Sequence, residues 1–265
     1  CHNQAEAEKA VDEIMVGKAF GAAGANVVIQ EFLEGIEVSL HALCDGTTAK
    51  IFPTSQDHKR VGDGDTGLNT GGMGTYSPTP FLNDTQLVEV ANKVLEPFMR
   101  GCVAEGIDYR GLLYPGVMLT KNGPKILEFN ARFGDPETQV YLTRLENDLV
   151  ELLDASASGT LAKHELKWKP AASVCVIMAS GGYPGNYPKG KPILGLAQAS
   201  TLPNAKVFHA GTALKDGQIV TNGGRVLGVT ALGKDLRAAQ AAAYAAVECI
   251  RFEGAHFRRD IAAKA

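Results

Sequence analysis

Three polar side chains alternate with apolar ones near the middle of the chain. Residues 126–132 read Ile-Leu-Glu-Phe-Asn-Ala-Arg, and in a β-strand this alternation would place Glu128, Asn130 and Arg132 on one face. Carboxylate and amide oxygens suit Mg²⁺ when waters and phosphate oxygens complete its shell, and an arginine fork matches a phosphate. The pattern indicates a metal and phosphate site. An ordinary half-exposed strand with a surface Glu–Arg pair would carry the same triplet.

A turn and a helix follow this strand. Residues 134–137 read Gly-Asp-Pro-Glu, a typical turn sequence. From Glu137 to Ala157 the apolar residues recur at helical spacing, which predicts one helix over this range. A polar-faced strand that ends at the start of a helix is a common place for a phosphate.

The segment from residue 56 to 78, called here the Gly-rich segment, contains six glycines. It is predicted to be a long loop without a helix or regular strand, anchored by Met73 and Tyr76. Glycines let backbone N–H groups approach an anion, and Lys59 and Arg60 add positive charge. The alternative for such a segment is a mobile surface loop.

A third segment, residues 27–40, is an apolar stretch interrupted by polar residues 31–35. By itself it predicts a strand–turn–strand hairpin.

Together these segments resemble glycinamide ribonucleotide synthetase (phosphoribosylamine–glycine ligase), an ATP-grasp family of purine synthesis. The resemblance implies an α/β fold of the α+β kind, with an ATP-grasp catalytic portion and a smaller C-terminal α/β domain. The matching strings lie in residues 126–139, 56–60, 69–74, 208–212 and 223–227.

The resemblance implies that ATP, glycine and phosphoribosylamine give glycinamide ribonucleotide, ADP and phosphate through a glycyl phosphate. Glu128 and Asn130 would hold Mg²⁺ or Mn²⁺, whereas an earlier carboxylate ligand of some ATP-grasp relatives has no counterpart on residues 112–119. The hinge of the family would bind the adenine edge through the backbone of residues 31–33, and Glu37 would bind the ribose hydroxyls. The ATP-binding positions are therefore Glu31, Phe32, Leu33 and Glu37.

The resemblance also implies an acceptor-substrate site. Its catalytic positions would be Asp57, Lys59 and Arg132. Its substrate-binding positions would be Asp57, His58, Lys59, Gly71, Gly72, Met73 and Arg132. For His58 a role in packing the loop stays open, and Met73 also fits a hydrophobic anchor.

The domain organisation follows from the same resemblance. Residues 1–165 would form the ATP-grasp portion, with 1–46 in the ATP lid lobe and 47–165 in the catalytic lobe, and residues 171–265 the C-terminal domain. Apolar periodicity predicts helices over 84–106 and 235–250, and one near the start of the chain capped by Asn3. Strands are expected at 40–44, 112–119, 125–130, 173–178, 206–214, 218–221 and 225–232.

Bulk composition excludes several classes of protein. The 265 residues carry a net charge of −3, so nothing points to binding of nucleic acid or of an anionic membrane. Five scattered cysteines indicate free thiols of a reducing, cytoplasmic compartment. The partners expected are small molecules. A binding module without turnover is one alternative, and a carboxylase-type ligase, which the 56–60 string disfavours, is another.

The chain begins at Cys1 without an initiator methionine, and we expect it to be a piece of a longer polypeptide. The family carries an N-terminal domain and a lysine-containing loop over the ATP phosphates that this sequence lacks, so the isolated piece is expected to be inactive. Eukaryotic members are often fused to other purine-pathway enzymes.

Overall fold

The computed structural model describes Cys1 and residues 3–265. These residues group into two compact units, Cys1–Glu34 and Gly35–Ala265. Helices and antiparallel sheets make up the fold, as the α+β expectation requires.

The first unit is helical. Helix α1 (Gln4–Val11) begins where the sequence predicts, because the side-chain oxygen of Asn3 accepts a 3.0 Å hydrogen bond from the backbone N–H of Glu6. A π-helical turn (Asp12–Val16) and a 3₁₀ helix (Gly21–Ala25) follow.

The predicted hairpin over residues 27–40 is wrong. Residues 26–34 form no strand, and Val28, Ile29 and Phe32 are exposed. Only the second half becomes a strand, β1 (Ile36–Ser39), and it pairs with β8 from much later in the chain. A nonlocal partner has therefore replaced the local one that the pattern suggested.

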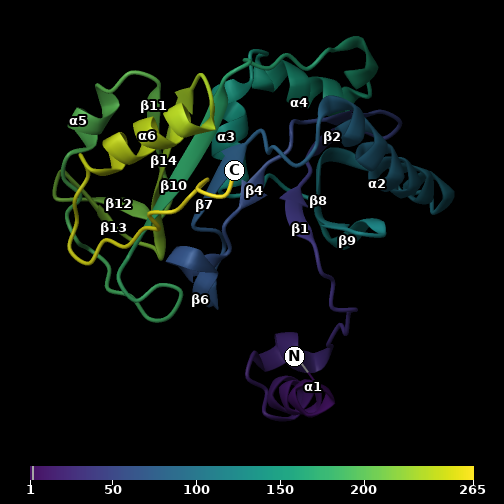
Figure 1. Ribbon diagram of the computed structural model, residues 1–265, viewed down its shortest axis with the longest axis horizontal. Helices are drawn as coiled ribbons and strands as arrows, with labels where there is room; N and C mark the ends of the chain where they lie inside the picture. Colours follow the sequence, from purple (N-terminus) through teal and green to yellow (C-terminus); the bar gives the residue numbers. More distant parts are fainter. Residues whose placement is uncertain (2) are drawn as a thin grey trace. The chain divides into compact units, whose positions relative to one another are not determined.

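The first sheet of the second unit is built around the long strand β8 (Arg110–Thr120), which pairs antiparallel with β1 along one half and with β2 along the other. Helix α2 (Asp84–Ala104) covers one face of this sheet, and α3 and α4 contribute to the core on the other face (Figure 1). The remaining elements are β2 (Ala42–Asp45), β3 (Ala49–Ile51), β9 (Gly123–Asn130), α3 (Glu137–Arg144) and α4 (Leu149–Ser158).

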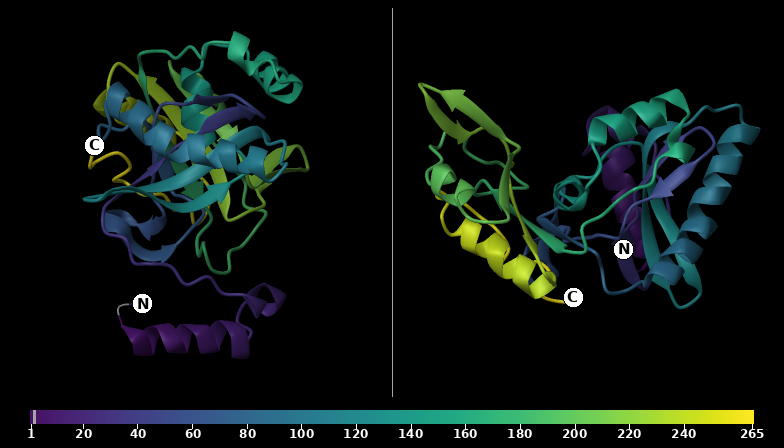
Figure 2. Two further views of the ribbon diagram at one scale, coloured as in Figure 1. Left: turned by 90° about the vertical axis from the view of Figure 1, so that its right-hand side faces the viewer. Right: turned by 90° about the horizontal axis from the view of Figure 1, so that it is seen from above.

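The second sheet has the order β11-β14-β10-β7-β4 and is also antiparallel. Strand β10 (Ala172–Ala179) is buried on both faces, because Val174 and Val176 pack in the core with α6 whereas Cys175 and Ile177 contact Val140 of α3. Figure 2 shows α6 (Leu236–Val247) lying along this sheet. The other strands are β4 (Gln56–Asp57), β7 (Gly74–Ser77), β11 (Ala205–His209) and β14 (Arg225–Gly233).

Two hairpins, a short α-helix and two 3₁₀ helices, Asp63–Asp65 and Leu161–Lys163, are the smaller elements of the second unit. Strands β12 (Thr212–Lys215) and β13 (Gln218–Thr221) form a hairpin, and the one strand predicted over 206–214 is in fact β11 and β12. Strands β5 (Arg60–Gly62) and β6 (Thr66–Asn69) form a second hairpin. Helix α5 (Leu196–Ser200) was not predicted.

The Gly-rich segment is more regular than predicted, since β4 to β7 all lie within it. Its strand β7 pairs with β10, and a Cβ at Gly74 would lie 2.7 Å from the carbonyl oxygen of Cys175. Glycine thus permits the close approach of the two strands. Met73 and Tyr76 are fully buried and anchor the segment, as predicted.

This pairing also crosses the expected domain boundary. Strands on both sides of residues 165–171 share the second sheet, and the contacts place residues 35–265 in one unit. The division into domains at 165/171, and that at 46/47, remains a prediction from the family pattern.

The single helix predicted over residues 137–157 is interrupted between α3 and α4. The side chain of Asn147 bonds to the backbone of Glu165 and Lys167, and Asp148 accepts a 2.7 Å bond from Val150 N–H as the cap of α4. Such side-chain bonds to the backbone compete with helix continuation, and apolar spacing does not reveal them.

Two further observations concern the cysteines and the length and apolar character of the helices. All five cysteines are free thiols, as predicted. In the part of the chain that the structure describes, no helix has the length and apolar character needed to cross a bilayer.

The carboxylate of Asp45 ties the turn after β2 to residues far along the chain. It is 2% exposed and accepts backbone bonds from Thr47, Thr48 and Leu161 at 3.1, 2.7 and 2.9 Å. Burial alone would raise the pKa of this carboxyl, but these donors outweigh burial and hold the pKa below its ordinary value.

We predict that Asp45→Asn lowers the free energy of unfolding by about 1–3 kcal/mol at pH 7, because a charged acceptor of several backbone bonds is lost. A depressed folded-state pKa contributes stability above the unfolded pKa of about 3.9, and this contribution disappears as the pH falls through the folded pKa. The difference from wild type should therefore shrink below about pH 4. Urea unfolding at pH 7 and in acid measures it, with the exposed Asp154→Asn as control. A constant difference at all pH values would contradict the assignment.

Candidate functional site

A polar pocket of the second unit brings together five of the predicted site residues, namely Asp57, Lys59, Gly71, Glu128 and Arg132. Its volume is about 160 Å³, and its walls come from β4 and the Gly-rich segment, β8, the end of β9 and the start of α3. Four carboxylates and two cations line it. The lining residues are Asp57, Lys59, Thr70, Gly71, Tyr114, Glu128, Arg132, Asp135 and Glu137.

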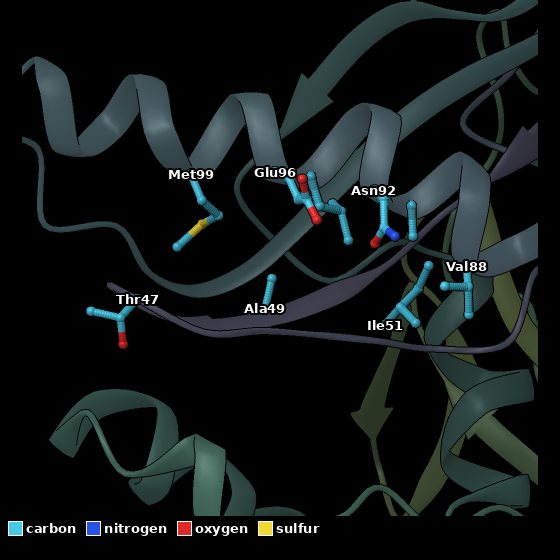
Figure 3. Close-up of a pocket in the computed structure, with 9 residues that line it drawn as sticks. Thr47, Ala49, Ile51, Val88, Asn92, Glu96 and Met99 are labelled. Atoms are coloured by element: carbon cyan, nitrogen blue, oxygen red, sulfur yellow. The ribbon is translucent and has the colours of Figure 1, made fainter.

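A larger pocket of about 240 Å³ lies between α2 and β3 (Figure 3). Its walls are mostly apolar, and its only ionisable side chain is Glu96. A site for chemistry needs several convergent polar groups. We therefore take the polar pocket as the candidate site.

The alternating triplet forms a connected chain at the end of β9. The amide nitrogen of Asn130 donates to Oε1 of Glu128 at 3.0 Å, and Nη2 of Arg132 donates to Oδ1 of Asn130 at 3.2 Å. Glu128 and Arg132 both line the pocket. The three side chains therefore lie together, as predicted, although the strand itself ends at Asn130 and Arg132 follows it.

The oxygen donors of this triplet fit a magnesium ion. Within the described residues, no group of three or more His, Cys, Asp and Glu side chains could hold a metal. Glu128 and Asn130 supply one carboxylate and one amide oxygen beside the pocket. Mg²⁺ commonly takes one or two protein oxygens and completes its shell with water and phosphate.

Asp57 is a buried carboxylate with an unused acceptor. Its side chain is 5% exposed, Oδ2 lies 3.7 Å from Nζ of Lys59, and Oδ1 has no hydrogen-bond partner. Burial, and next the negative charge of Glu137, raise the pKa of Asp57 well above its ordinary value, against the opposing charges of Lys59 and Arg225. This corner of the pocket therefore favours a bound cation or hydrogen-bond donor.

Lys59 is shared between two carboxylates. Its Nζ lies 3.2 Å from Glu37 and 3.7 Å from Asp57. Burial would lower its pKa, but the two carboxylates outweigh burial and raise it, so the ammonium stays charged.

Glu137 is a site residue that the sequence did not reveal. It is 2% exposed and accepts hydrogen bonds from Tyr114 at 2.5 Å and from Ser39 at 3.2 Å. The ring of Tyr114 stacks on His41 with centroids 4.0 Å apart. Burial, helped by Arg132, lowers the pKa of His41 to about 3, so this imidazole is neutral and belongs to the core. In the sequence Glu137 appeared only as the start of a helix.

Arg225 of β14 is a second residue that the sequence did not mark as part of the site. It connects Gly71 and Asp135, which both line the pocket wall. Its Nη2 lies 3.0 Å from Oδ2 of Asp135, and its Nη1 donates to the carbonyl oxygen of Gly71 at 2.6 Å. Gly72 has φ +113°, and a Cβ there would lie 2.5 Å from Pro136 and 2.6 Å from Oδ1 of Asp57. Only glycine fits between these two groups.

Two predicted substrate contacts face the protein instead. His58 is 6% exposed; its Nδ1 lies 3.2 Å from the carbonyl oxygen of Gly74, and its Nε2 accepts from Ala262 N–H at 3.4 Å. This geometry favours the loop-packing alternative for His58. Burial also lowers its pKa to about 4. Met73 is fully buried and acts as the anchor.

The predicted ATP-binding positions are divided between the two units. Glu31, Phe32 and Leu33 lie in the extended end of the first unit, where Phe32 is 76% exposed. Glu37 lies on β1 in the second unit and pairs with Lys59. The assignment of these residues to ATP stays a prediction.

Two regions of this chain match known protein families. Residues 1–138 match phosphoribosylglycinamide synthetase, ATP-grasp (A) domain, and residues 173–264 match phosphoribosylglycinamide synthetase, C domain. The phosphoribosylamine–glycine ligase of Pseudomonas aeruginosa is 53% identical over 99% of this chain and 61% of its own length. The trifunctional purine biosynthetic protein adenosine-3 of Gallus gallus is 52% identical over 99% of this chain and 26% of its own. This chain therefore spans less than two thirds of either relative.

Solved structures agree with the sequence comparison. The crystal structure of phosphoribosylamine–glycine ligase from Thermotoga maritima matches with a TM-score of 0.78 and 39% identity, over 88% of this chain and 57% of that one. The biotin carboxylase domain of a thermophilic 2-oxoglutarate carboxylase matches with a TM-score of 0.65 over 97% of this chain and 56% of that one. At 12% identity the second likeness shows a shared fold alone.

We predict that Glu137→Gln lowers the pKa of Asp57, because one of the two main influences that raise it is the charge of Glu137. The pKa should stay above its ordinary value, since burial remains. Titration of ¹³C-labelled aspartate carboxyls by NMR measures the change. The control is Glu128→Gln, which removes a carboxylate of the same pocket that is not among the main influences on Asp57. Equal shifts in both variants would contradict the pairing.

Proposed function

This chain belongs to the phosphoribosylglycinamide synthetase family, and we propose that the polypeptide containing it ligates glycine to 5-phosphoribosylamine. ATP would be the phosphoryl donor, and the products would be glycinamide ribonucleotide, ADP and phosphate. The observation that carries the proposal is the polar pocket, in which the Gly-rich segment, the end of β9 and the start of α3 bring four carboxylates and two cations together.

The polarity of this pocket suits a small zwitterion. Asp57 and Glu137 would receive the ammonium group of glycine, which supplies the donor that Oδ1 of Asp57 lacks. Arg132 would face the carboxylate end, beside Glu128. The amino acid would then be oriented with its carboxylate toward the phosphoryl donor, and such orientation is a large part of catalysis of phosphoryl transfer.

The chemistry explains why orientation and exclusion of water matter. A carboxylate is a poor electrophile, so its oxygen first takes the γ-phosphoryl group of ATP, and the amine of phosphoribosylamine then displaces phosphate from the glycyl phosphate. Glu128 and Asn130 would hold Mg²⁺ or Mn²⁺, which supplies charge neutralisation to the phosphates when bound. The backbone of residues 71–74 would help exclude water from an intermediate that hydrolyses readily.

The remaining parts of the proposal rest on the family pattern. The backbone of Glu31, Phe32 and Leu33 would bind the adenine edge. Glu37 would bind the ribose after exchanging its partner Lys59, 3.2 Å away. We place the protein in the cytoplasm, with fusion to other purine-pathway domains as an option that the name of the Gallus gallus relative supports.

The test is turnover by the complete polypeptide, measured as phosphate release that requires ATP, glycine and phosphoribosylamine together. Glu128→Gln should reduce the rate on the order of 10²-fold or more, and Asn130→Asp, which keeps an oxygen ligand, much less. Residues 1–265 alone should show no comparable rate, since closure of a lid commonly completes such sites. Turnover with bicarbonate but not glycine would reject the proposal, and near-normal activity of Glu128→Gln at saturating Mg²⁺ would reject the metal assignment.

A second prediction concerns Gly72. Gly72→Ala should lower kcat/KM about 10²-fold, because the new Cβ displaces Asp57 or Pro136 and a shift near 1 Å suffices for such a loss. Gly123→Ala is the matched control, since Gly123 also has positive φ (+101°) but nothing within 4 Å of the added Cβ. Both variants carry the same kind of backbone strain, and equal activity would show that the Gly72 contacts do not matter.

A further inference from the structure

The residues after α6 fold back onto the Gly-rich segment. We name residues 256–264 the tail segment, and we propose that its Arg258 is a positioning residue that holds the Gly-rich segment in the conformation that binds the acceptor substrates. This inference rests on the proposed function, because it assigns a further role in the same site.

Arg258 joins the two segments through a fully buried guanidinium. Nε and Nη2 donate to the two oxygens of Asp260, both at 2.7 Å, within the tail segment. Nη1 donates to Oδ1 of Asp65 at 2.8 Å and to the carbonyl oxygen of Arg60 at 3.2 Å, both in the Gly-rich segment. A fork paired with two carboxylates gives strong, geometrically specific bonds.

Backbone bonds on both sides of Arg258 continue the contact. Oδ2 of Asp260 accepts from Gly64 N–H at 2.8 Å, and Oδ1 of Asp63 accepts from Arg259 N–H at 2.7 Å. Nε2 of His256 lies 2.8 Å from the carbonyl oxygen of Val61. Strand β5 and the turn of the β5–β6 hairpin are thus tied to the tail segment.

The tail segment is itself fixed to the core. The hydroxyl of Tyr244 on α6 donates to the carbonyl oxygen of Arg258 at 2.8 Å and accepts from Ile261 N–H at 3.1 Å. Gln240 donates to the carbonyl oxygen of Ile261 at 2.7 Å. The side chain of Ile261 is fully buried in the same core cluster as Tyr76 of β7. The second sheet and α6 therefore provide a rigid support.

His58 connects the tail segment to the residues that line the pocket. Its Nε2 accepts from Ala262 of the tail segment at 3.4 Å, and its neighbours in sequence, Asp57 and Lys59, line the pocket. The carbonyl oxygen of Lys59 accepts two bonds from Thr70, at 2.7 and 2.8 Å, which close the hairpin beside the pocket. Displacement of the hairpin would move these pocket residues.

The charges around Arg258 explain why this residue is critical for the contact between the tail segment and the Gly-rich segment. Asp65 and Asp260 both bond to it, and Asp63 lies in the same turn. Without the guanidinium these carboxylates would repel one another, with Lys264 left as a partner of Asp65 only. Loss of Arg258 should therefore open the contact rather than merely weaken it.

The experiment compares Arg258→Met with Arg259→Met in the complete polypeptide. Arg259 is the matched control, because its side chain is 70% exposed and pairs with Glu248 outside the Gly-rich segment. We expect Arg258→Met to raise the KM for glycine and phosphoribosylamine at least tenfold and to leave the KM for ATP within twofold, with Arg258→Lys intermediate. Arg259→Met should resemble wild type. Unchanged acceptor KM values, or an equal rise in the KM for ATP, would overturn the proposal.

Amide hydrogen exchange provides a readout independent of turnover. In Arg258→Met the amides of Gly64 and Thr70 should exchange at least tenfold faster, whereas those of β8 should not change. Protection equal to wild type would overturn the positioning role even if the polypeptide catalyses another reaction. If Arg258→Met fails to fold, Asp65→Asn, at a half-exposed position, removes one arm of the contact and must show the same selective loss of protection.

Discussion

The antiparallel pairing of β7 with β10 is the constraint on which the candidate site depends. It inserts the end of the Gly-rich segment into the second sheet, with Thr75 opposite Cys175 and Asp57 of β4 opposite Thr75. Ordering a segment with six glycines costs much conformational entropy, and the hydrogen bonds and burial that this pairing provides offset the cost. Because the sheet provides the order, Asp57 can be buried at a fixed place while the glycines give the close approaches that side chains would block.

Buried carboxylates are costly unless they are paired or hydrogen-bonded, and the site contains two of them. Glu137 is satisfied by Tyr114 and Ser39, whereas Oδ1 of Asp57 is not. The fold thus retains an unfavourable arrangement at the place where the proposed substrate carries a positive charge. Such local departures from optimal stability concentrate at functional sites. The ammonium group of glycine would relieve the arrangement, so part of the binding energy would come from the protein's own electrostatics.

Much of the site could be predicted from local sequence. The residues that could not be predicted depend on contacts between segments that lie far apart in the chain. The period of a strand sufficed to place Glu128 and Asn130 together, Arg132 joins them from just beyond the end of the strand, and the glycine pattern marked the segment that carries Asp57 and Lys59. Tyr114 and Glu137 had no local signal, because their role depends on β8 and α3 meeting beside β4. The hairpin predicted at residues 27–40 failed for the same reason, since β1 takes its partner from β8.

Two arginines show how the two family regions combine. Arg225 and Arg258 both come from the region that matches the C domain, and both bind the Gly-rich segment, which lies in the region that matches the A domain. Arg225 holds the carbonyl oxygen of Gly71 beside the pocket, and Arg258 holds the hairpin at the other end. By sequence similarity the Gly-rich segment belongs to the first region alone. Its hydrogen bonds to Arg225 and Arg258 nevertheless connect it to the second region as well. The Gly-rich segment is therefore held jointly by residues of both regions, and under the proposed function the second region would help to position the acceptor substrates.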